Sequence, residues 1–288
     1  MQKPELAVIG GSGFYQMEGM DSHVEEVRVS TPFGDPSDAI IVGSLSGVPI
    51  AFLARHGRGH RISPSEINQR ANIWALKSLG VSRILSISAV GSMREDLHPL
   101  DVVIPDQLFD RTRRRPSTFF GDGLVAHVSF ADPFCPALSD ALEAAARQCA
   151  PRVHRGGTYV CIEGPQFSTR AESRIYRQWG VDIIGMTAVP EAKLAREAEI
   201  CYSTLALVTD YDVWHVSEET VTVEMVVANL AKNVSVAQET IRRIVPLLAG
   251  LGGCGCGSAL ASALITRRES VPAEVKTRLA PIIDKYLR

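Results

Sequence analysis

The chain has 288 residues, 45% of them hydrophobic, and its formal net charge is −2. Such a chain can bury a substantial core, and its charge provides no overall attraction to nucleic acid or to an anionic membrane surface. The first residues hold only a short apolar run, and no stretch approaches the roughly 20 apolar residues of a membrane span. We therefore expect a cytoplasmic globular protein with no nucleic-acid or membrane partner.

Short apolar runs rich in β-branched residues alternate with amphipathic segments along the chain. The apolar runs predict buried strands at residues 5–11, 48–57, 82–92, 101–107, 157–165, 181–187 and 200–210. The amphipathic segments predict helices at residues 64–80, 135–149, 169–180, 189–199 and 217–251. This order predicts a single α/β domain over residues 1–288, with a mixed, largely parallel central sheet surrounded by helices. Residues 253–288 follow a glycine break and are expected to form a helical appendage.

Small and basic residues follow three of the predicted strands. Gly10–Gly13 (GGSG) and Ser88–Ser92 (SAVGS) offer hydroxyls and close backbone approach to an anion, although the first is also compatible with a simple tight turn. The sequence ARHGRGHR places Arg55, His56 and His60 in one short segment. Anion binding fits this segment best, with a solvated basic loop and a metal site as alternatives. Because strand ends gather at one edge of such a sheet, the three segments predict one phosphate cradle.

The sequence EGPQFSTRAE follows another predicted strand. Thr169 and Glu172 have the spacing of a capping box, which leaves Phe167 and Ser168 free to contact a ligand. The alternative is that Phe167 belongs to the core and Glu163 is a satisfied structural carboxylate. The isolated basic run RTRRRP, residues 111–116, is expected to be a solvated or subunit-contact loop rather than a nucleic-acid-binding segment.

The last predicted strand ends in two aspartates, in the sequence VTDYDVW. Unpaired carboxylates beside an apolar core are costly, so Asp210 and Asp212 need partners or a function. In an extended chain residues two apart point to the same face, so both could face one ligand while Tyr211 points away. The alternative is a structural pair that caps the next helix or forms a salt bridge.

Six cysteines are spread along the chain, at Cys135, Cys149, Cys161, Cys201, Cys254 and Cys256. Their density is not that of a disulfide-stapled secreted domain, and buried free thiols are expected. Cys254 and Cys256 could form a local redox pair or belong to a glycine hinge, and Cys135 could pair with Cys201 in a protein from a hyperthermophile. Two cysteines alone do not make a zinc site, so no metal site is predicted.

Together these motifs resemble those of one enzyme family. The segments GGSGF, LARHGRGH, NIWALKSLG, SAVGSMRE, IPDQLFDRT, EGPQFSTRAES, MTAVPE and VTDYDVW are similar, in order and spacing, to those of the 5′-methylthioadenosine phosphorylases of the purine nucleoside phosphorylase superfamily. The resemblance implies a pentosyltransferase of purine and methionine salvage, which converts methylthioadenosine and phosphate into adenine and 5-methylthioribose 1-phosphate. It also implies a nucleoside phosphorylase-like fold, a homotrimer or dimer of trimers, and no metal or organic cofactor.

The resemblance implies roles for individual residues as well. Phosphate contacts are expected from Ser12, Arg55, His56, Ser88, Ala89 and Thr187. The base is expected to pack on Phe167, with Ser168 and the catalytic pair Asp210 and Asp212 at its edge, and the sugar is expected near Met186 and His60. The pocket for the 5′-methylthio group is expected to be lined by Val223 and Val226, three apart on one helix face, and by His127 of a neighbouring subunit.

The chemistry of the implied reaction agrees with these residue types. Breaking an N-glycosidic bond builds positive charge on the sugar and negative charge on the purine, so an anion is needed below the sugar and a proton donor at the base. A carboxyl group can donate that proton if its pKa is raised by burial and by a second carboxylate. Two alternatives are a phosphorylase that prefers adenosine or methylthioinosine, and a nucleosidase in which water replaces phosphate.

Overall fold

The computed structural model describes residues 3–20, 24–215 and 223–287, and only the backbone of residues 223–227. The strands in these ranges are β1 (Leu6–Gly10), β2 (Glu25–Val27), β3 (Ile40–Leu45), β4 (Val48–Ala54), β5 (Arg83–Ser92), β6 (Val102–Ile104), β7 (Gln107–Arg111), β8 (Val153–Arg155), β9 (Thr158–Ile162), β10 (Ile183–Gly185) and β11 (Cys201–Asp210). The α-helices are α1 (Gln69–Ser78), α2 (Pro136–Ala146), α3 (Arg170–Gln178), α4 (Ala188–Glu197), α5 (Val223–Ile244), α6 (Ala273–Arg278) and α7 (Ala280–Leu287). None of the helices described is long and apolar enough to cross a membrane.

All of these strands join one mixed sheet, as the sequence predicts. One path runs β2-β3-β4-β1-β5-β10-β9-β7, and β11 pairs with β5 and β6 while β6 pairs with β8. The central pairs β1–β4, β1–β5 and β5–β11 are parallel, and antiparallel pairs include β2–β3, β3–β4 and β5–β10. The sheet branches at β5, because its carboxyl end pairs with both β11 and β10.

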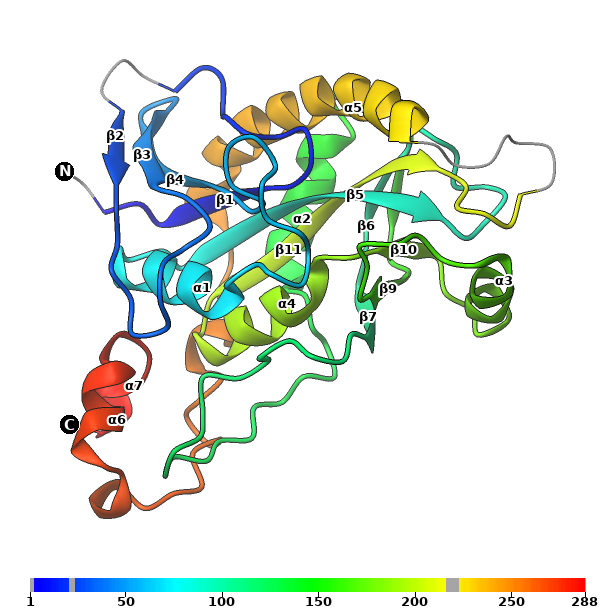
Figure 1. The fold of residues 1–288 in the computed structure, drawn as a ribbon. Coiled ribbons are helices and arrows are strands. Elements are labelled where there is room, and N and C mark those ends of the chain that lie inside the picture. Colours follow the sequence, from blue (N-terminus) through cyan, green and yellow to red (C-terminus); the bar gives the residue numbers. More distant parts are fainter. Residues whose placement is uncertain (1–2, 21–23, 216–222, 288) are drawn as a thin grey trace.

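The sheet is buried on both faces, which explains the continuous apolar runs. Along β1, Ala7 and Ile9 pack in the core cluster that contains the inner faces of α1 and α4, whereas Leu6 and Val8 pack in the cluster that contains α2 and α5. Figure 1 shows α1 and α4 on one side of the central strands and α5 on the other. The last helices, α6 and α7, lie beside α1, where Trp74 Nε1 donates to the carbonyl of Arg278 at 3.0 Å.

Four short strands were not predicted from the sequence, namely β2, β3, β7 and β8. β3 and β4 form a hairpin whose turn residues Ser46 and Gly47 both have positive φ, 53° and 76°. Two consecutive residues with positive φ form the tight turn that matches strand twist, and a Ser-Gly pair is a weak signal for it. β2 and β8 have only three residues each, too few to show a period.

Candidate active site

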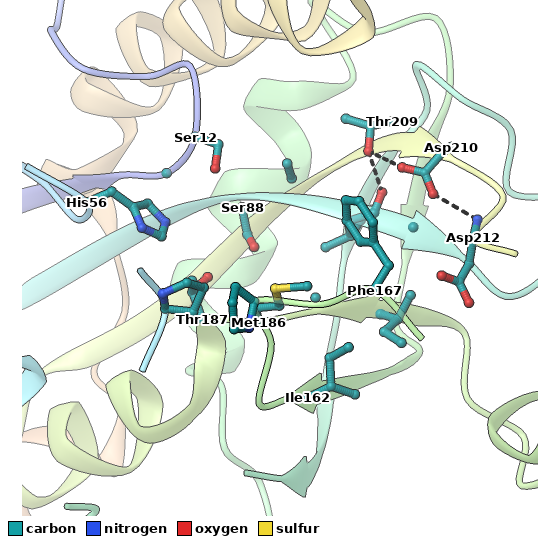
Figure 2. Close-up of a pocket in the computed structure, with 18 of the residues that line it drawn as sticks. Ser12, His56, Ser88, Ile162, Phe167, Met186, Thr187, Thr209, Asp210 and Asp212 are labelled. Carbon is teal, nitrogen blue, oxygen red and sulfur yellow. Dashed lines mark hydrogen bonds between the residues drawn. The ribbon is translucent and has the colours of Figure 1, made fainter. Parts of the chain in front are cut away.

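The carboxyl ends of β1, β4, β5, β9, β10 and β11 surround one cavity of about 260 Å³. It is lined by Gly11, Ser12, Arg55, His56, His60, Pro64, Ser88, Ala89, Val90, Gly91, Ile162, Pro165, Phe167, Ser168, Ile184, Gly185, Met186, Thr187, Thr209, Asp210 and Asp212. Figure 2 shows Ser12 and His56 at one end of this cavity, Asp210 and Asp212 at the other, and Met186 between them. The separate predicted segments therefore meet at a single site.

Gly11 allows the first segment to approach the centre of the sheet. A Cβ atom at this position would lie 2.4 Å from the carbonyl oxygen of Ile87 and 2.9 Å from a guanidinium nitrogen of Arg55. Both distances are too short for any side chain, so glycine is required here. The close approach brings Ser12, which is half-buried, to the wall of the cavity.

Arg55 lines the cavity, but most of its N–H groups donate hydrogen bonds to other protein atoms. Its Nε and one terminal nitrogen donate to the carboxylate of Glu191 at 2.8 and 3.0 Å, and both side chains are fully buried. Further bonds reach the hydroxyl of Ser86 at 2.7 Å and the carbonyl of Ile87 at 2.9 Å. A guanidinium has five N–H donors, so one N–H remains for a ligand. Glu191 also compensates the positive charge, which makes the cradle less cationic than the sequence alone indicates.

His56 is held as a neutral ring with a defined tautomer. Its Nδ1 lies 2.8 Å from the carbonyl of Ile62, and because a carbonyl only accepts, Nδ1 carries the proton and Nε2 is an acceptor. Burial, with the charge of Arg55 adding to it, lowers the pKa of His56 to about 4. The ring stacks on His60 with centroids 4.3 Å apart, and His60 Nδ1 lies 2.8 Å from the hydroxyl of Tyr15.

The other basic residues of the ARHGRGHR segment do not reach the cavity. Arg58 is exposed and pairs with Glu26 at 2.6 Å and with Asp38 at 3.1 Å. Arg61 donates to the carbonyl of Ser37 at 2.9 Å. The segment thus combines three cavity-lining residues, Arg55, His56 and His60, with two arginines that bond elsewhere on the protein, and spacing alone could not separate them.

The hydroxyls of Ser88 and Thr187 and the small residue Ala89 complete this end of the cavity. Ser88 Oγ lies 3.0 Å from the hydroxyl of Tyr159, whose pKa burial raises to about 12, so that phenol stays protonated. Thr187 is the N-cap residue of α4, yet its side chain does not cap the helix. Ala89 adds a small side chain next to Ser88. The donors at this end are thus neutral hydroxyls with the single N–H that remains on Arg55.

Asp210 and Asp212 form the other end, although their geometry differs from the predicted extended pair. β11 ends at Asp210, and Asp212 has a positive φ of 53°, so the two carboxylates do not reach the cavity by strand alternation. Instead the chain turns, and the backbone N–H of Asp212 donates to Asp210 Oδ1 at 2.8 Å. Tyr211 is buried and stacks on His215 with ring centroids 4.5 Å apart.

Both carboxyl groups are buried and resist ionisation. Burial is the main cause that raises the pKa of Asp210, against a 2.6 Å hydrogen bond between Asp210 Oδ2 and Thr209 Oγ1. Burial, together with the nearby charge of Asp210, raises the pKa of Asp212 to about 6, although the hydroxyl of Ser173 donates to Asp212 Oδ2 at 2.6 Å. The structural alternatives, a helix cap or a salt bridge, find no supporting contact among the described residues.

Phe167 and Ser168 stand beside the aspartates at the start of α3. The predicted capping box is present, with Thr169 Oγ1 accepting from the Glu172 N–H and Glu172 accepting from the Thr169 N–H. Phe167 is 47% exposed, so it belongs to the mouth of the cavity rather than to the core. Ser168 Oγ is buried and finds no hydrogen-bond partner among the described residues. An unpaired buried hydroxyl in a cavity wall calls for a ligand.

Glu163 and Arg115 are structural instead, whereas Arg111, Arg113 and Arg114 of the basic run are exposed, as predicted. Arg115, predicted to lie in a solvated or subunit-contact loop, has a side chain only 4% exposed and contacts Glu163 at 3.1 Å. It also donates to the carbonyls of Met186 at 2.6 Å and Val189 at 2.8 Å. Arg115 thus fixes the segment that carries Met186 and Thr187, a role the sequence run did not indicate. Gly91, Ile184 and Thr209 also line the cavity without having been predicted individually, although Gly91 and Thr209 lie within the motifs SAVGS and VTDYDVW.

Three predicted residues are not placed in this cavity. His127 is exposed on a loop, and its backbone N–H donates to the carbonyl of Ala263 at 2.9 Å. Val223 and Val226 belong to α5, but their side chains lie outside the described part of the chain. None of these three side chains is therefore placed at the predicted pocket for the 5′-methylthio group.

The fold and the cavity together define an α/β enzyme with a polar cavity at the carboxyl ends of the strands of a mixed sheet. Residues 5–246 match the family model described as the phosphorylase superfamily, and the chain belongs to this family. It is 56% identical over 282 residues to an S-methyl-5′-thioadenosine phosphorylase of Koribacter versatilis, covering 98% of this chain and 96% of the relative.

Solved structures agree with this assignment. A methylthioadenosine phosphorylase from an antarctic soil metagenomic library has a TM-score of 0.93 and 55% identity, with coverage of 98% of this chain and 99% of that one. A methylthioadenosine phosphorylase from Schistosoma mansoni in complex with adenine has a TM-score of 0.81 and 37% identity, with 98% of each chain covered. The predicted family and fold class are confirmed by these likenesses.

Proposed function

We propose that this protein catalyses the phosphorolysis of 5′-methylthioadenosine, which yields adenine and 5-methylthioribose 1-phosphate. The observation that carries the proposal is one cavity with Ser12 and His56 at one end and the carboxyl groups of Asp210 and Asp212 at the other, on opposite sides of Met186. In this arrangement phosphate attacks the sugar carbon from one side while the base leaves toward the carboxyl groups on the other. The names of the 56% and 55% identical relatives support the same substrate.

The purine is proposed to lie on Phe167 with its polar edge toward Ser168, Asp210 and Asp212. Asp210 serves N7 of the leaving base, and its raised pKa favours the protonated form that can donate there. An ionised carboxylate only accepts hydrogen bonds, so Asp212 suits a 6-amino group and opposes a 6-oxo group. Adenine is therefore the preferred base, and methylthioinosine is a poor substrate.

Phosphate is proposed to bind Ser12, His56, Ser88, the Ala89 backbone, Thr187 and the remaining N–H of Arg55. Because the neutral His56 offers only an acceptor at Nε2, it pairs with an O–H of phosphate, which both the monobasic and the dibasic ion carry. His60 stands behind His56 in the stack, where it limits the ring's movement.

The 5′-methylthio group is proposed to lie among Val223, Val226 and His127 of a neighbouring subunit in a homotrimer or dimer of trimers. The His127 loop supports such a contact, because two exposed apolar residues flank it. Val125 is 45% exposed and Ile265 is 62% exposed, and Ile265 N–H donates to the Val125 carbonyl at 2.9 Å. Adjacent exposed apolar side chains are typical of a subunit contact.

The remaining parts of the proposal concern cofactors and location. The reaction uses phosphate as a co-substrate and no organic cofactor, since the charge changes fall on phosphate, the hydroxyls and the aspartates. The cytoplasm is the proposed compartment, because six free thiols suit a reducing environment.

The test is adenine release from methylthioadenosine with and without phosphate, followed by chromatography of both products. Adenine release that depends on phosphate, with formation of methylthioribose 1-phosphate, is the expected result. Equal release without phosphate would identify a nucleosidase instead. A panel of methylthioadenosine, adenosine, methylthioinosine, inosine and guanosine decides between this activity and a sibling phosphorylase.

A further inference from the structure

Four cysteines that are far apart in the sequence meet at one point, on the opposite end of β11 from the active site. Their sulfur atoms, those of Cys135, Cys201, Cys254 and Cys256, all lie within 4.8 Å of one another. All four are free thiols, and the sulfurs of Cys201 and Cys254 are 3.3 Å apart. Cys201 is the first residue of β11, whereas Asp210 at the active site is its last.

The spacing of the four sulfurs suits a tetrahedral metal centre. A zinc ion holds thiolates at about 2.3 Å, which places neighbouring sulfurs about 3.8 Å apart. Cys135 and Cys256 are buried, Cys201 is half-buried and Cys254 is exposed. The cluster is therefore enclosed on the protein side and open at Cys254, which leaves a path for an ion to enter. We propose that Cys135, Cys201, Cys254 and Cys256 bind one structural zinc ion.

The surroundings of the cluster favour the ionised, thiolate form of the cysteine side chains. Cys135 is the N-cap residue of α2, so the positive end of that helix dipole faces its sulfur. Arg83 lines the same cleft as Cys135, Cys201 and Cys254, and its guanidinium is paired with Glu5 at 3.0 Å. When zinc binds, the four thiols release their protons to solvent, and the resulting centre carries a net charge of −2. The helix end offsets part of that charge.

A complete set of four sulfur ligands indicates a structural rather than a catalytic ion. Catalytic zinc keeps an open position for water, whereas closed sites with four cysteines stabilise folded structure. Here the ion would join three separate parts of the chain: the start of α2, the start of β11 and the segment that carries Cys254 and Cys256. That last segment leads into residues 263–266, which pair with the His127 loop. The zinc ion would therefore anchor the C-terminal segment to the sheet, independently of the proposed catalytic activity.

The first test is the zinc content of protein purified under reducing conditions from zinc-supplemented cells. We expect about one zinc per chain by elemental analysis, and six reactive thiols after denaturation in a chelator without reductant. Cobalt substituted for zinc should show the intense visible absorption and sulfur charge-transfer bands of a tetrahedral thiolate site. Protein without bound metal, whether its thiols are all free or joined in disulfides, would overturn the proposal.

The matched variants are Cys254→Ser and Cys149→Ser. Cys254 is exposed, so its substitution should leave the chain folded, while Cys149 lies outside the cluster and donates to the Ala145 carbonyl. We expect Cys254→Ser to lose stoichiometric zinc and Cys149→Ser to retain it. Chelation should lower the thermal midpoint of wild type and Cys149→Ser but not that of Cys254→Ser. Stoichiometric zinc retained by a Cys254→Ser, Cys256→Ser double variant would place the metal elsewhere and overturn the assignment.

Discussion

At the scale of a single residue, the proposed preference for methylthioadenosine over methylthioinosine depends on Asp210. Its carboxyl group is buried, bonded to Thr209 and to the Asp212 backbone, and still faces the cavity. The Asp210→Asn variant offers an amide donor but has no acidic proton to transfer. We expect kcat for methylthioadenosine to fall by about 10²–10⁴-fold, the range for loss of a general acid or base. The ratio of methylthioadenosine to methylthioinosine activity should narrow, because the amide N–H can pair with a 6-oxo group.

The Asp210→Asn experiment needs a stability control and a pH profile. Similar thermal midpoints for the variant and wild type would exclude general damage. A raised pKa means that wild type keeps its acid form to higher pH, so kcat/KM should decline on the alkaline side as Asp210 ionises. That decline should be absent in the variant. An equal loss of both substrates with an unchanged pH profile would refute the role at N7.

For Asp212 we predict an effect on the stability of the fold rather than on the reaction rate. Its pKa is raised from 3.8 to about 6 in the folded protein, so the folded state holds a proton that the unfolded state releases earlier. Stability from this group is fully present below pH 3.8 and is lost as the pH rises through about 6. Asp212→Asn, which can still accept from Ser173, should therefore be more stable than wild type at pH 7 by roughly 1–3 kcal/mol.

Denaturant unfolding at pH 7 and at pH 4 measures this effect. The gain in unfolding free energy should shrink toward zero at the lower pH, where the wild-type carboxyl is protonated. A gain of the same size at both values would show that ionisation of Asp212 is not its cause. Loss of nucleoside turnover in the same variant is expected separately, from the contact with the base.

At the scale of elements, the ion pair between Arg55 and Glu191 joins the end of β4 to α4. Both side chains are fully buried, so removing one partner leaves an uncompensated charge. We expect Arg55→Ala to lower the unfolding free energy by roughly 3–5 kcal/mol as well as to weaken phosphate binding. The double variant with Glu191→Ala should be less destabilised than the sum of the two single variants. Additive losses, measured by denaturant unfolding, would contradict this coupling.

The phosphate role of this end of the cavity is tested better at Ser12, which is only half-buried. Ser12→Ala should raise the phosphate KM and leave the thermal midpoint close to that of wild type, because the lost hydrogen bond is made to the bound anion and contributes roughly 1.5–3 kcal/mol. That loss corresponds to a KM increase of about 10- to 150-fold. A phosphate KM equal to that of wild type would remove Ser12 from the cradle.

Helix and strand positions follow closely from local patterns, and the irregular connections do not. The capping box at Thr169 and Glu172 is local, so its spacing in the sequence predicts it directly. The turn at Asp212 was predicted as extended chain, because its positive φ depends on the hydrogen bond to Asp210 and on packing beneath Gly91. Arg115 illustrates the same limit, since its buried partners come from strand ends far along the chain.

At the scale of the whole molecule, the proposed oligomer depends on the loop of His127. Lysine at the 62% exposed Ile265 would place a charge in the proposed contact, so Ile265→Lys should dissociate the assembly and reduce turnover of methylthioadenosine. Light scattering after size-exclusion chromatography measures the oligomeric state. Val24→Lys, at a residue 46% exposed, is the matched control and should leave the oligomeric state and the turnover unchanged. An assembly that survives Ile265→Lys would locate the interface elsewhere.

The sequence alone determined the α/β class, the order of the main strands and helices, the motif set of the family, and most residues of the cavity wall. These follow from periodicity and from motifs that are contiguous along the chain. Only the tertiary structure decided that Arg55 is paired with Glu191, that Arg115 is buried, that Ser168 Oγ has no hydrogen-bond partner within the described ranges, and that four distant cysteines meet at one point. Each of these depends on contacts between residues far apart in sequence, which are set by how the helices and loops pack on the sheet and leave no local pattern.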